Sequence, residues 1–210
     1  MNRTPQLILG AFLAFVSAWL GVVAYSYVKL GHLAPEVDAG SGASVPPGMS
    51  GLAAAGQRVY AANGCVYCHT QQVRPSYLSA DIEKKLGPRR TVARDYLWDQ
   101  PAFPGFTRIG PDLSNYGLRA PAVGEIHRKL YEPTHVVPAS IMPSFRSLYK
   151  MREISGQPSA DALVGLTGPH APVKGYEVLP SEDAKALVAY LLSLKRDYPL
   201  PEAPPETAAP

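Results

Sequence analysis

The chain has 210 residues, which is enough for one domain with a membrane anchor but too few for two ordinary domains and an anchor. Its formal net charge is +3 and charged residues of both signs make up 18% of it, which excludes the concentrated basic surface of a nucleic-acid-binding protein. The 22 prolines predict long irregular stretches between a few helices, so we expect a mainly α fold without an extensive sheet.

The first predicted element is a transmembrane anchor within residues 1–30. Residues 7–28 (LILGAFLAFVSAWLGVVAYSYV) contain no charged side chain, and a helix needs about twenty apolar residues to cross the hydrocarbon core. A cleaved signal peptide is the competing interpretation. However, the apolar run is longer than the usual core of roughly 7 to 15 residues, and no small-x-small cleavage site follows it directly. The sequence therefore favours an uncleaved anchor.

Two segments flank a predicted domain over residues 50–197. Residues 31–49 combine Gly, Ser, Ala and Pro without apolar periodicity, which predicts a linker between anchor and domain. Residues 198–210 form a proline-rich tail with no apolar pattern for packing, so we expect it to be disordered or extended.

Three helices are predicted within the domain. The first covers Gly51 to Asn63, and the second covers Ala122 to Tyr131 and stops before Pro133. The last has Ser181 as its N-cap and carries an apolar stripe ahead of two basic residues. The stripe consists of Ala184, Leu187, Val188 and Leu191, and the basic residues are Lys195 and Arg196.

The motif Cys65-Val66-Tyr67-Cys68-His69 directly follows the first of these helices. Its two thiols lie one helical turn apart, so both can add to the vinyl groups of one haem while the adjacent imidazole reaches the iron. The covalent bonds prevent haem loss, and a neutral imidazole is a strong-field ligand suited to low-spin iron. The motif therefore predicts one haem c, attached through Cys65 and Cys68 and ligated by His69.

Two other kinds of site use a Cys-x-x-Cys pair. A thioredoxin-like thiol pair expects a strand before the motif and a βαβ context, whereas a helix is predicted here. A zinc site needs two further ligands at finger spacing, but His127 and His135 are eight positions apart. A periplasmic thiol oxidoreductase remains an alternative function, and it predicts a titratable dithiol and no haem absorbance.

The sixth iron ligand has to come from elsewhere in the domain. Met1 and Met49 precede the domain, which leaves Met142 and Met151 among the four methionines. Met142 is preferred because Pro143 disfavours helical geometry at the preceding residue and places this methionine in an extended loop. Without the haem motif, a methionine is usually only a core-filling residue. The alternatives, which would make a bis-histidine site, are His127, His135 and His170.

The segment Gly110-Pro111-Asp112-Leu113 is tight and rigid. Its backbone carbonyls are candidates to accept the second ring proton of His69, because metal-bound histidines usually donate that proton to a neighbouring oxygen. Any loop can contain Gly-Pro, so the prediction depends on its combination with the haem motif.

These residues resemble a class I cytochrome c domain. Gly56 and Tyr60 match the family's Gly/aromatic helix, and Leu187 and Tyr190 match its C-terminal partner. The two helices cross in that family, and a glycine at such a crossing allows the backbones to approach closely.

More specifically, the chain resembles subunit II, the anchored monohaem cytochrome of cbb3-type cytochrome c oxidase, over nearly all of residues 1–197. The resemblance is carried by residues 65–75 (CVYCHTQQVRP), 108–117 (RIGPDLSNYG) and 125–143 (EIHRKLYEPTHVVPASIMP). Residues 150–180 follow the family poorly, and Thr70-Gln71-Gln72 replaces its Ser-Gln-Met. In the family, the matching residues are the haem cysteines Cys65 and Cys68, the proximal ligand His69 and the distal ligand Met142.

The resemblance implies a non-catalytic subunit that relays electrons to the oxygen-reducing subunit of a haem-copper oxidase. Its partners would be that catalytic subunit, other cytochrome c subunits and the membrane. Because such haem attachment resembles a reaction of the bacterial periplasm, we expect a single-pass protein of the inner membrane with a cytoplasmic N-terminus and a periplasmic haem domain. The alternative is a free-standing anchored cytochrome c that shuttles electrons between respiratory complexes, which requires a long and mobile linker at 31–49.

The long insertion between His69 and Gly110 is a trait of subunit II. It holds seven basic residues against four acidic ones. Such charges are usually only solvated. The functional hypothesis is that some of its arginines neutralise haem propionates or dock the domain on the oxidase core. The arginines singled out are Arg74, Arg89, Arg90 and Arg94.

Overall fold

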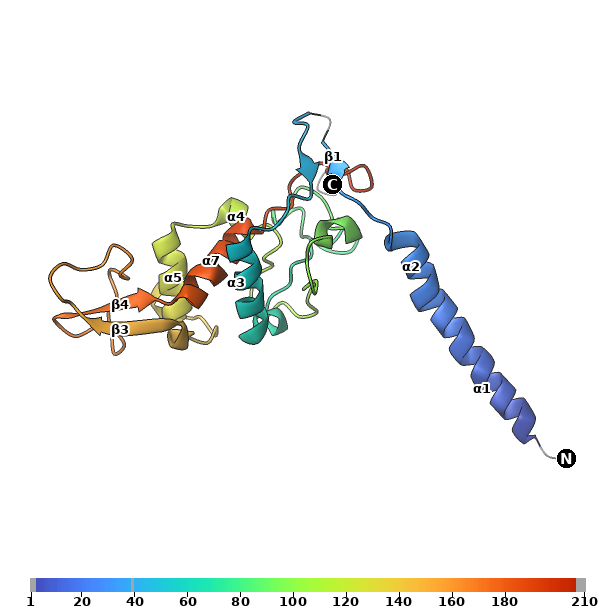
Figure 1. Ribbon diagram of the computed structural model, residues 1–210, viewed down its shortest axis with the longest axis horizontal. Helices are drawn as coiled ribbons and strands as arrows, with labels where there is room; N and C mark the ends of the chain where they lie inside the picture. Colours follow the sequence, from blue (N-terminus) through green and yellow to red (C-terminus); the bar gives the residue numbers. More distant parts are fainter. Residues whose placement is uncertain (1–2, 39, 207–210) are drawn as a thin grey trace.

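The computed structural model describes residues 3–38 and 40–206. It consists of a long N-terminal helix and a mainly helical domain with extended irregular loops, as expected from the composition (Figure 1). The helix projects from one end of the domain, and a two-stranded β-ribbon lies at the opposite end.

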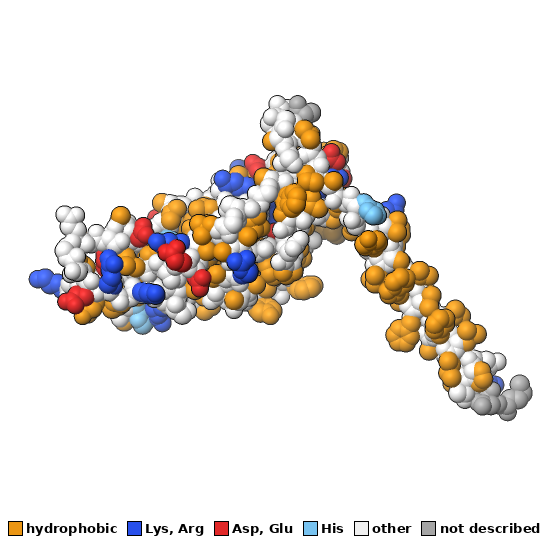
Figure 2. Space-filling view, in the orientation of Figure 1, with side chains coloured by type: hydrophobic (Ala, Val, Ile, Leu, Met, Phe, Trp, Pro, Cys, Tyr) orange, Lys and Arg blue, Asp and Glu red, His pale blue; other side chains and the backbone are white. Residues whose placement is uncertain are grey.

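The N-terminal helix runs through α1 (Thr4–Trp19), a π-helical segment (Leu20–Ala24) and α2 (Tyr25–Leu30). Together they make a helix of 27 residues, which is about 40 Å long at 1.5 Å per residue and exceeds the roughly 30 Å of a hydrocarbon core. Apolar side chains cover it in Figure 2, and its most apolar stretch is not buried against the domain. In length and composition this helix is suited to cross a membrane, although a signal sequence shares both properties.

The domain is built around the crossing of α3 (Gly51–Ala62) and α7 (Glu182–Ser193). Each helix begins after a serine N-cap, because the hydroxyl groups of Ser50 and Ser181 each accept the amide proton three residues later, at 3.2 Å. The predicted apolar stripe of α7 is buried in the core. The first and last predicted helices of the domain are therefore confirmed, including the cap of the last one.

Gly56 lies where the two helices touch. A Cβ atom on this residue would be 1.9 Å from the Ala186 carbonyl oxygen and 2.7 Å from the Cβ of Tyr190. On the same two helices, the rings of Tyr60 and Tyr190 pack edge to face with centroids 5.4 Å apart. The close approach of the backbones thus depends on the missing side chain, which explains a glycine inside a helix.

The substitution Gly56→Ala is expected to destabilise the domain by about 3 kcal/mol, because the added methyl group forces the helices apart. Chemical denaturation should be compared with Gly51→Ala on the same helix, where a Cβ meets no atom within 4 Å and little change or a small gain is expected. Equal stabilities of the two variants would show that α3 and α7 do not cross at Gly56.

The second predicted helix is present as α5 (Val123–Tyr131), which packs Ile126 and Leu130 into the core. It is flanked by two single-turn helices, α4 (Tyr116–Arg119) and α6 (Pro133–Val136). Short 3-10 turns cover Cys65–Tyr67, Ala93–Tyr96 and Arg146–Leu148.

Strands in the described part of the chain form two antiparallel pairs. The first pairs β1 (Glu36–Val37) with β2 (Ser44–Val45), and the second pairs β3 (Tyr149–Glu153) with β4 (Tyr176–Pro180). The second pair is the ribbon at the end of the domain remote from the N-terminal helix (Figure 1).

The segment expected to be a linker, 31–49, contacts the domain near both of its ends, while residues 40–44 at the tip of its hairpin are exposed. The guanidinium of Arg94 contacts the Ala34 carbonyl and forms an ion pair with Glu36 at 3.2 Å. Farther along, the β1–β2 hairpin returns the chain to the domain, and Val45 is buried there. The packed chain therefore begins shortly after the end of α2.

The C-terminal tail also packs, so the expectation that it had no means of packing is wrong. Leu200 and Ala203 are buried, with 3% and 1% of their surfaces exposed. Between them, Glu202 forms an ion pair with Arg94 at 2.6 Å. The tail lies against the insertion, and residues 207–210 fall outside the described residues.

Candidate functional site

The haem motif forms a tight turn directly after α3. The amides of Cys68 and His69 both donate to the Cys65 carbonyl, at 3.2 and 3.0 Å. Because this turn folds the chain back on itself, both thiols and the imidazole line one cavity. The adjacency of the three groups is thus a consequence of local backbone geometry.

That cavity has a volume of about 360 Å³ and lies among α3, α5, α7 and the loop 137–145. Cys65, Cys68 and His69 line it, and Met142 lines it from the loop. The structure therefore brings together the four residues predicted to bind a haem. The remaining wall is largely apolar and includes Tyr60, Leu113, Leu130, Phe145, Leu187 and Leu191.

The imidazole of His69 is held by the segment that follows the insertion. Its Nδ1 lies 2.7 Å from the Pro111 carbonyl oxygen, which confirms the predicted contact with a backbone carbonyl of this segment. Because a carbonyl can only accept, Nδ1 carries the proton and Nε2 keeps its lone pair. Burial lowers the pKa of His69, although the bond to Pro111 opposes the shift, so the neutral imidazole, the form suited to bind a metal, is favoured.

Gly110 lies directly against the same ring. A Cβ on Gly110 would be 2.3 Å from Cε1 and 2.7 Å from Nδ1 of His69. The Gly110 amide donates to the Cys68 carbonyl at 2.9 Å, which fixes the glycine beside the motif. The imidazole therefore occupies a slot that only a residue without a side chain leaves open.

Met142 lies in an irregular loop, as the following proline predicts. The loop is anchored to α5 by the Phe145 amide, which donates to the Leu130 carbonyl at 2.8 Å. Within it, the Met142 amide donates to the Ser140 hydroxyl at 3.3 Å. The Met142 side chain is half-buried and packs against the core, next to the cavity.

The other candidates for the sixth ligand lie elsewhere in the described chain. Met151 is on β3 with 54% of its surface exposed and does not line the cavity. His127 is buried, with Nδ1 3.0 Å from the Tyr149 hydroxyl oxygen. His135 and His170 line a separate polar depression. Only Met142, among these side chains, lies in the cavity with His69.

The cavity fits a covalently attached haem better than the alternative sites. A c-type site uses two cysteine thiols for covalent attachment and an imidazole nitrogen and a thioether sulfur as iron ligands, and here residues of these four kinds line one apolar cavity. A reactive thiol pair requires a lowered pKa, whereas burial raises the pKa of Cys65 to about 11. For zinc, no cluster of three or more His, Cys, Asp or Glu side chains suited to a metal occurs within residues 3–38 and 40–206.

The insertion's arginines have structural partners that the sequence did not reveal. Arg89 is 2% exposed and forms two hydrogen bonds with Asp95, at 2.8 and 2.9 Å, so this charge is buried and paired, whereas most charges in such an insertion are solvated. Arg94 joins the tail to the segment after the N-terminal helix. No arginine among the described residues lines the cavity, where Lys129 is the basic side chain. The hypothesis that these arginines neutralise propionates therefore gains no support.

The chain matches a model of a known protein family. The model described as "Cytochrome C oxidase, mono-heme subunit/FixO" matches residues 43–164, more than half of the chain. The matched range contains the haem motif, the insertion and Met142. A comparison with curated protein sequences gives no match.

Proposed function

Because the chain belongs to the family of mono-haem cytochrome c oxidase subunits, we propose that it relays electrons through one haem c to the oxygen-reducing subunit of a cbb3-type haem-copper oxidase. Family membership by itself means a subunit with one haem that works in electron transfer beside other oxidase subunits. The finer proposal is supported by one observation above all, the cavity lined together by Cys65, Cys68, His69 and Met142. The relay makes and breaks no substrate bonds.

In this proposal the chain's residues bind and orient the cofactor. Cys65 and Cys68 would hold it through thioether bonds, and His69 Nε2 and Met142 Sδ would be the ligands of its iron. A haem bound there supplies one-electron transfer without bond rearrangement in a substrate. The Pro111 carbonyl holds the Nδ1 proton of His69, which leaves Nε2 free for the iron. The apolar wall would exclude water and keep the ligands in the same positions in the oxidised and the reduced state.

We also propose the topology. The helix Thr4–Leu30 anchors the chain in the bacterial inner membrane, with the N-terminus cytoplasmic and the haem domain periplasmic. The charges that flank the helix, Arg3 before it and Lys29 near its end, do not decide its direction. The haem motif supports the proposed direction, because covalent haem attachment resembles a reaction of the bacterial periplasm.

The alternative function is a free-standing anchored cytochrome c that shuttles between complexes. A shuttle needs a mobile linker so that its haem domain can reach several partners. Here Arg94 holds Ala34 and Glu36, and Trp98 donates its indole N–H to the Pro46 carbonyl at 2.9 Å. The short connection left after α2 favours a domain held beside one partner.

Purification in mild detergent tests the proposal. We expect the protein to elute from a size-exclusion column in a fixed ratio with a large haem-copper subunit, with one haem c on this chain. The matched comparison is a second run at high ionic strength, which removes weakly bound shuttle proteins. Elution as a separate monohaem protein in both runs would reject the subunit function and support the shuttle.

A further inference from the structure

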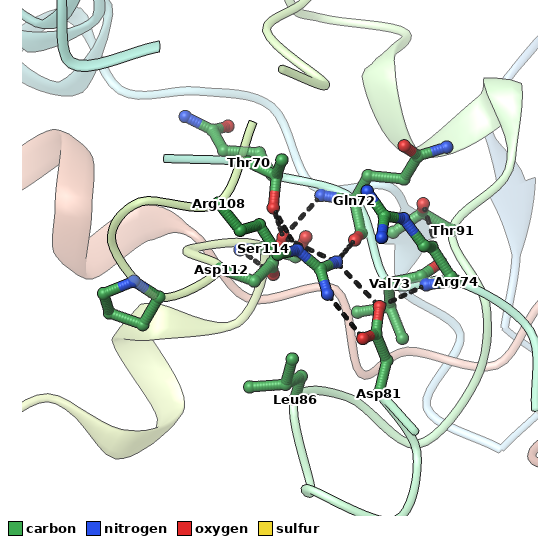
Figure 3. Close-up of polar contacts among 12 residues, drawn as sticks. Thr70, Gln72, Val73, Arg74, Asp81, Leu86, Thr91, Arg108, Asp112 and Ser114 are labelled. Atoms are coloured by element: carbon green, nitrogen blue, oxygen red, sulfur yellow. Dashed lines mark hydrogen bonds and ion pairs between the residues drawn. The ribbon is translucent and has the colours of Figure 1, made fainter. Parts of the chain in front are cut away.

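A network of polar side chains lies around the loop that carries Pro111 (Figure 3). Its members are Thr70, Asp81, Arg108 and Asp112, and none of them lines the cavity. We propose that Asp81 and Arg108 are positioning residues which, through Thr70 and Asp112, hold the Pro111 carbonyl against His69 and thereby lower the reduction potential of the haem. This inference rests on the proposed function, since it concerns the same site.

Asp112 connects the loop to the residues that follow His69. Its Oδ2 accepts hydrogen bonds from the Thr70 hydroxyl at 2.6 Å and from the Gln72 amide at 2.8 Å. The carboxylate is in the interior, because Asp112 is 1% exposed. Since Asp112 directly follows Pro111, these two bonds restrain the distance between the Pro111 carbonyl and the His69 ring.

Arg108 also binds the residues that follow His69. Its Nε donates to the Thr70 hydroxyl at 2.7 Å, and a second guanidinium nitrogen donates to the Gln72 carbonyl at 2.5 Å. Arginine can only donate and a carboxylate can only accept, so the Thr70 hydroxyl must accept from Arg108 and donate to Asp112. Thr70 is therefore a hydrogen-bonded link between Arg108 and Asp112, which also form a direct ion pair at 3.5 Å.

Asp81 fixes Arg108 from within the insertion. The two side chains form a bidentate pair at 2.5 and 2.7 Å, and Asp81 also accepts the Arg74 amide at 2.8 Å. Burial raises the pKa of Asp81, but the bonds from Arg108 and Arg74 outweigh it and lower the pKa to about 2. The carboxylate is therefore ionised at neutral pH, and by this route the insertion supports the site although its arginines do not line the cavity.

The expected effect follows from the hydrogen bond at Nδ1. A carbonyl that accepts the Nδ1 proton of a metal-bound histidine makes the imidazole a stronger donor. A stronger donor stabilises ferric more than ferrous iron and so lowers the reduction potential. Loosening the network lengthens the 2.7 Å contact between His69 and Pro111, which is expected to raise the potential.

Two variants with opposite charge changes separate positioning from a simple field effect. Asp81→Asn removes a negative charge and Arg108→Gln removes a positive charge. If these residues acted only through their fields, the first substitution would raise the potential and the second would lower it. The positioning role predicts that both raise it, measured by redox titration of the full-length protein in detergent.

A third variant changes no charge. Thr70→Val removes the hydroxyl link. We expect the ratio of reduced to oxidised haem at a fixed potential to rise about threefold. This corresponds to a rise of about 28 mV in the reduction potential, at 59 mV per tenfold for one electron. Thr70→Ser keeps the hydroxyl and should restore the wild-type potential. Arg152→Gln, in an ion pair with Glu177 on the β3–β4 ribbon, is the charge control and should leave the potential unchanged.

The signs of the shifts in reduction potential test the positioning role. Rises in Asp81→Asn, Arg108→Gln and Thr70→Val, with Thr70→Ser near wild type, support the positioning role. Opposite shifts in the two charge variants, or a wild-type potential in Thr70→Val, overturn it. If Thr70→Val does not load haem, the signs of the potential shifts in Asp81→Asn and Arg108→Gln are sufficient to test the positioning role. A wild-type protein without covalent haem would instead refute the proposed function, so the two failures are distinguishable.

Discussion

Replacement of Met142 by alanine is expected to abolish the low-spin spectrum of the oxidised protein and to lower the reduction potential. Met142 is the methionine that lines the cavity with His69, and its loop is fixed to α5 by the bond from Phe145 to Leu130. A thioether ligand raises the reduction potential of haem iron. Its loss should therefore lower the potential by a sizeable part of the roughly 0.8 V over which axial ligands set haem potentials. Absorption spectra and a redox titration measure both effects.

The matched control is Met151→Ala, which removes the same side chain from the exposed strand β3. Its spectrum and potential should equal those of the wild type. If Met142→Ala kept the low-spin spectrum, another residue would have to be the sixth ligand. His127, His135 and His170 would then be tested in turn, although each lies outside the cavity in the structure.

Replacement of Gly110 by alanine is expected to displace the proximal imidazole. The new Cβ would lie 2.3 Å from Cε1 of His69, and the ring cannot move freely because Nδ1 is held by the Pro111 carbonyl at 2.7 Å. Either the ring or the loop must shift, which costs about 1–3 kcal/mol of folding free energy. We expect less haem-loaded protein and a reduced low-spin fraction, measured by haem quantification per mole of protein and by absorption spectra.

Gly124→Ala serves as the control, because a Cβ at Gly124 meets no atom within 4 Å and the residue lies in α5 away from the imidazole. That variant should load haem normally. A Gly110→Ala protein with wild-type haem content, spectrum and stability would mean that the ring does not pack against this glycine.

The parts of the fold and site that the sequence predicts depend on local signals. The turn at Cys65–His69 is fixed by its own backbone hydrogen bonds, and the N-cap at Ser181 acts three residues along the chain. The proline that follows Met142 predicts that this residue lies in a loop, which is again a local effect. Helical periodicity predicts α3, α5 and α7, and it too is a local signal, because it depends on residues three and four positions apart.

The parts that the sequence did not predict depend on partners far apart in the chain. Arg108 and Asp81 are 27 positions apart with no shared helix, so no spacing rule connects them. The tail looked unable to pack because Leu200 and Ala203 are isolated apolar residues among prolines, and their burial depends on the insertion. Arg196 was expected only as a basic residue after the last helix, yet it forms an ion pair with Asp99 at 2.9 Å. Such contacts exist only after the insertion has folded around the helices.

Mass determination of the intact protein tests whether haem is covalently attached at Cys65 and Cys68. We expect the mass of the polypeptide plus one haem, retained after denaturation because both thiols are consumed in thioether bonds. A Cys65→Ser/Cys68→Ser double variant should lose the added mass and the haem stain on a denaturing gel. Unmodified thiols at Cys65 and Cys68 with no added mass, in protein made by a host that matures c-type cytochromes, would show that the chain is not a c-type cytochrome.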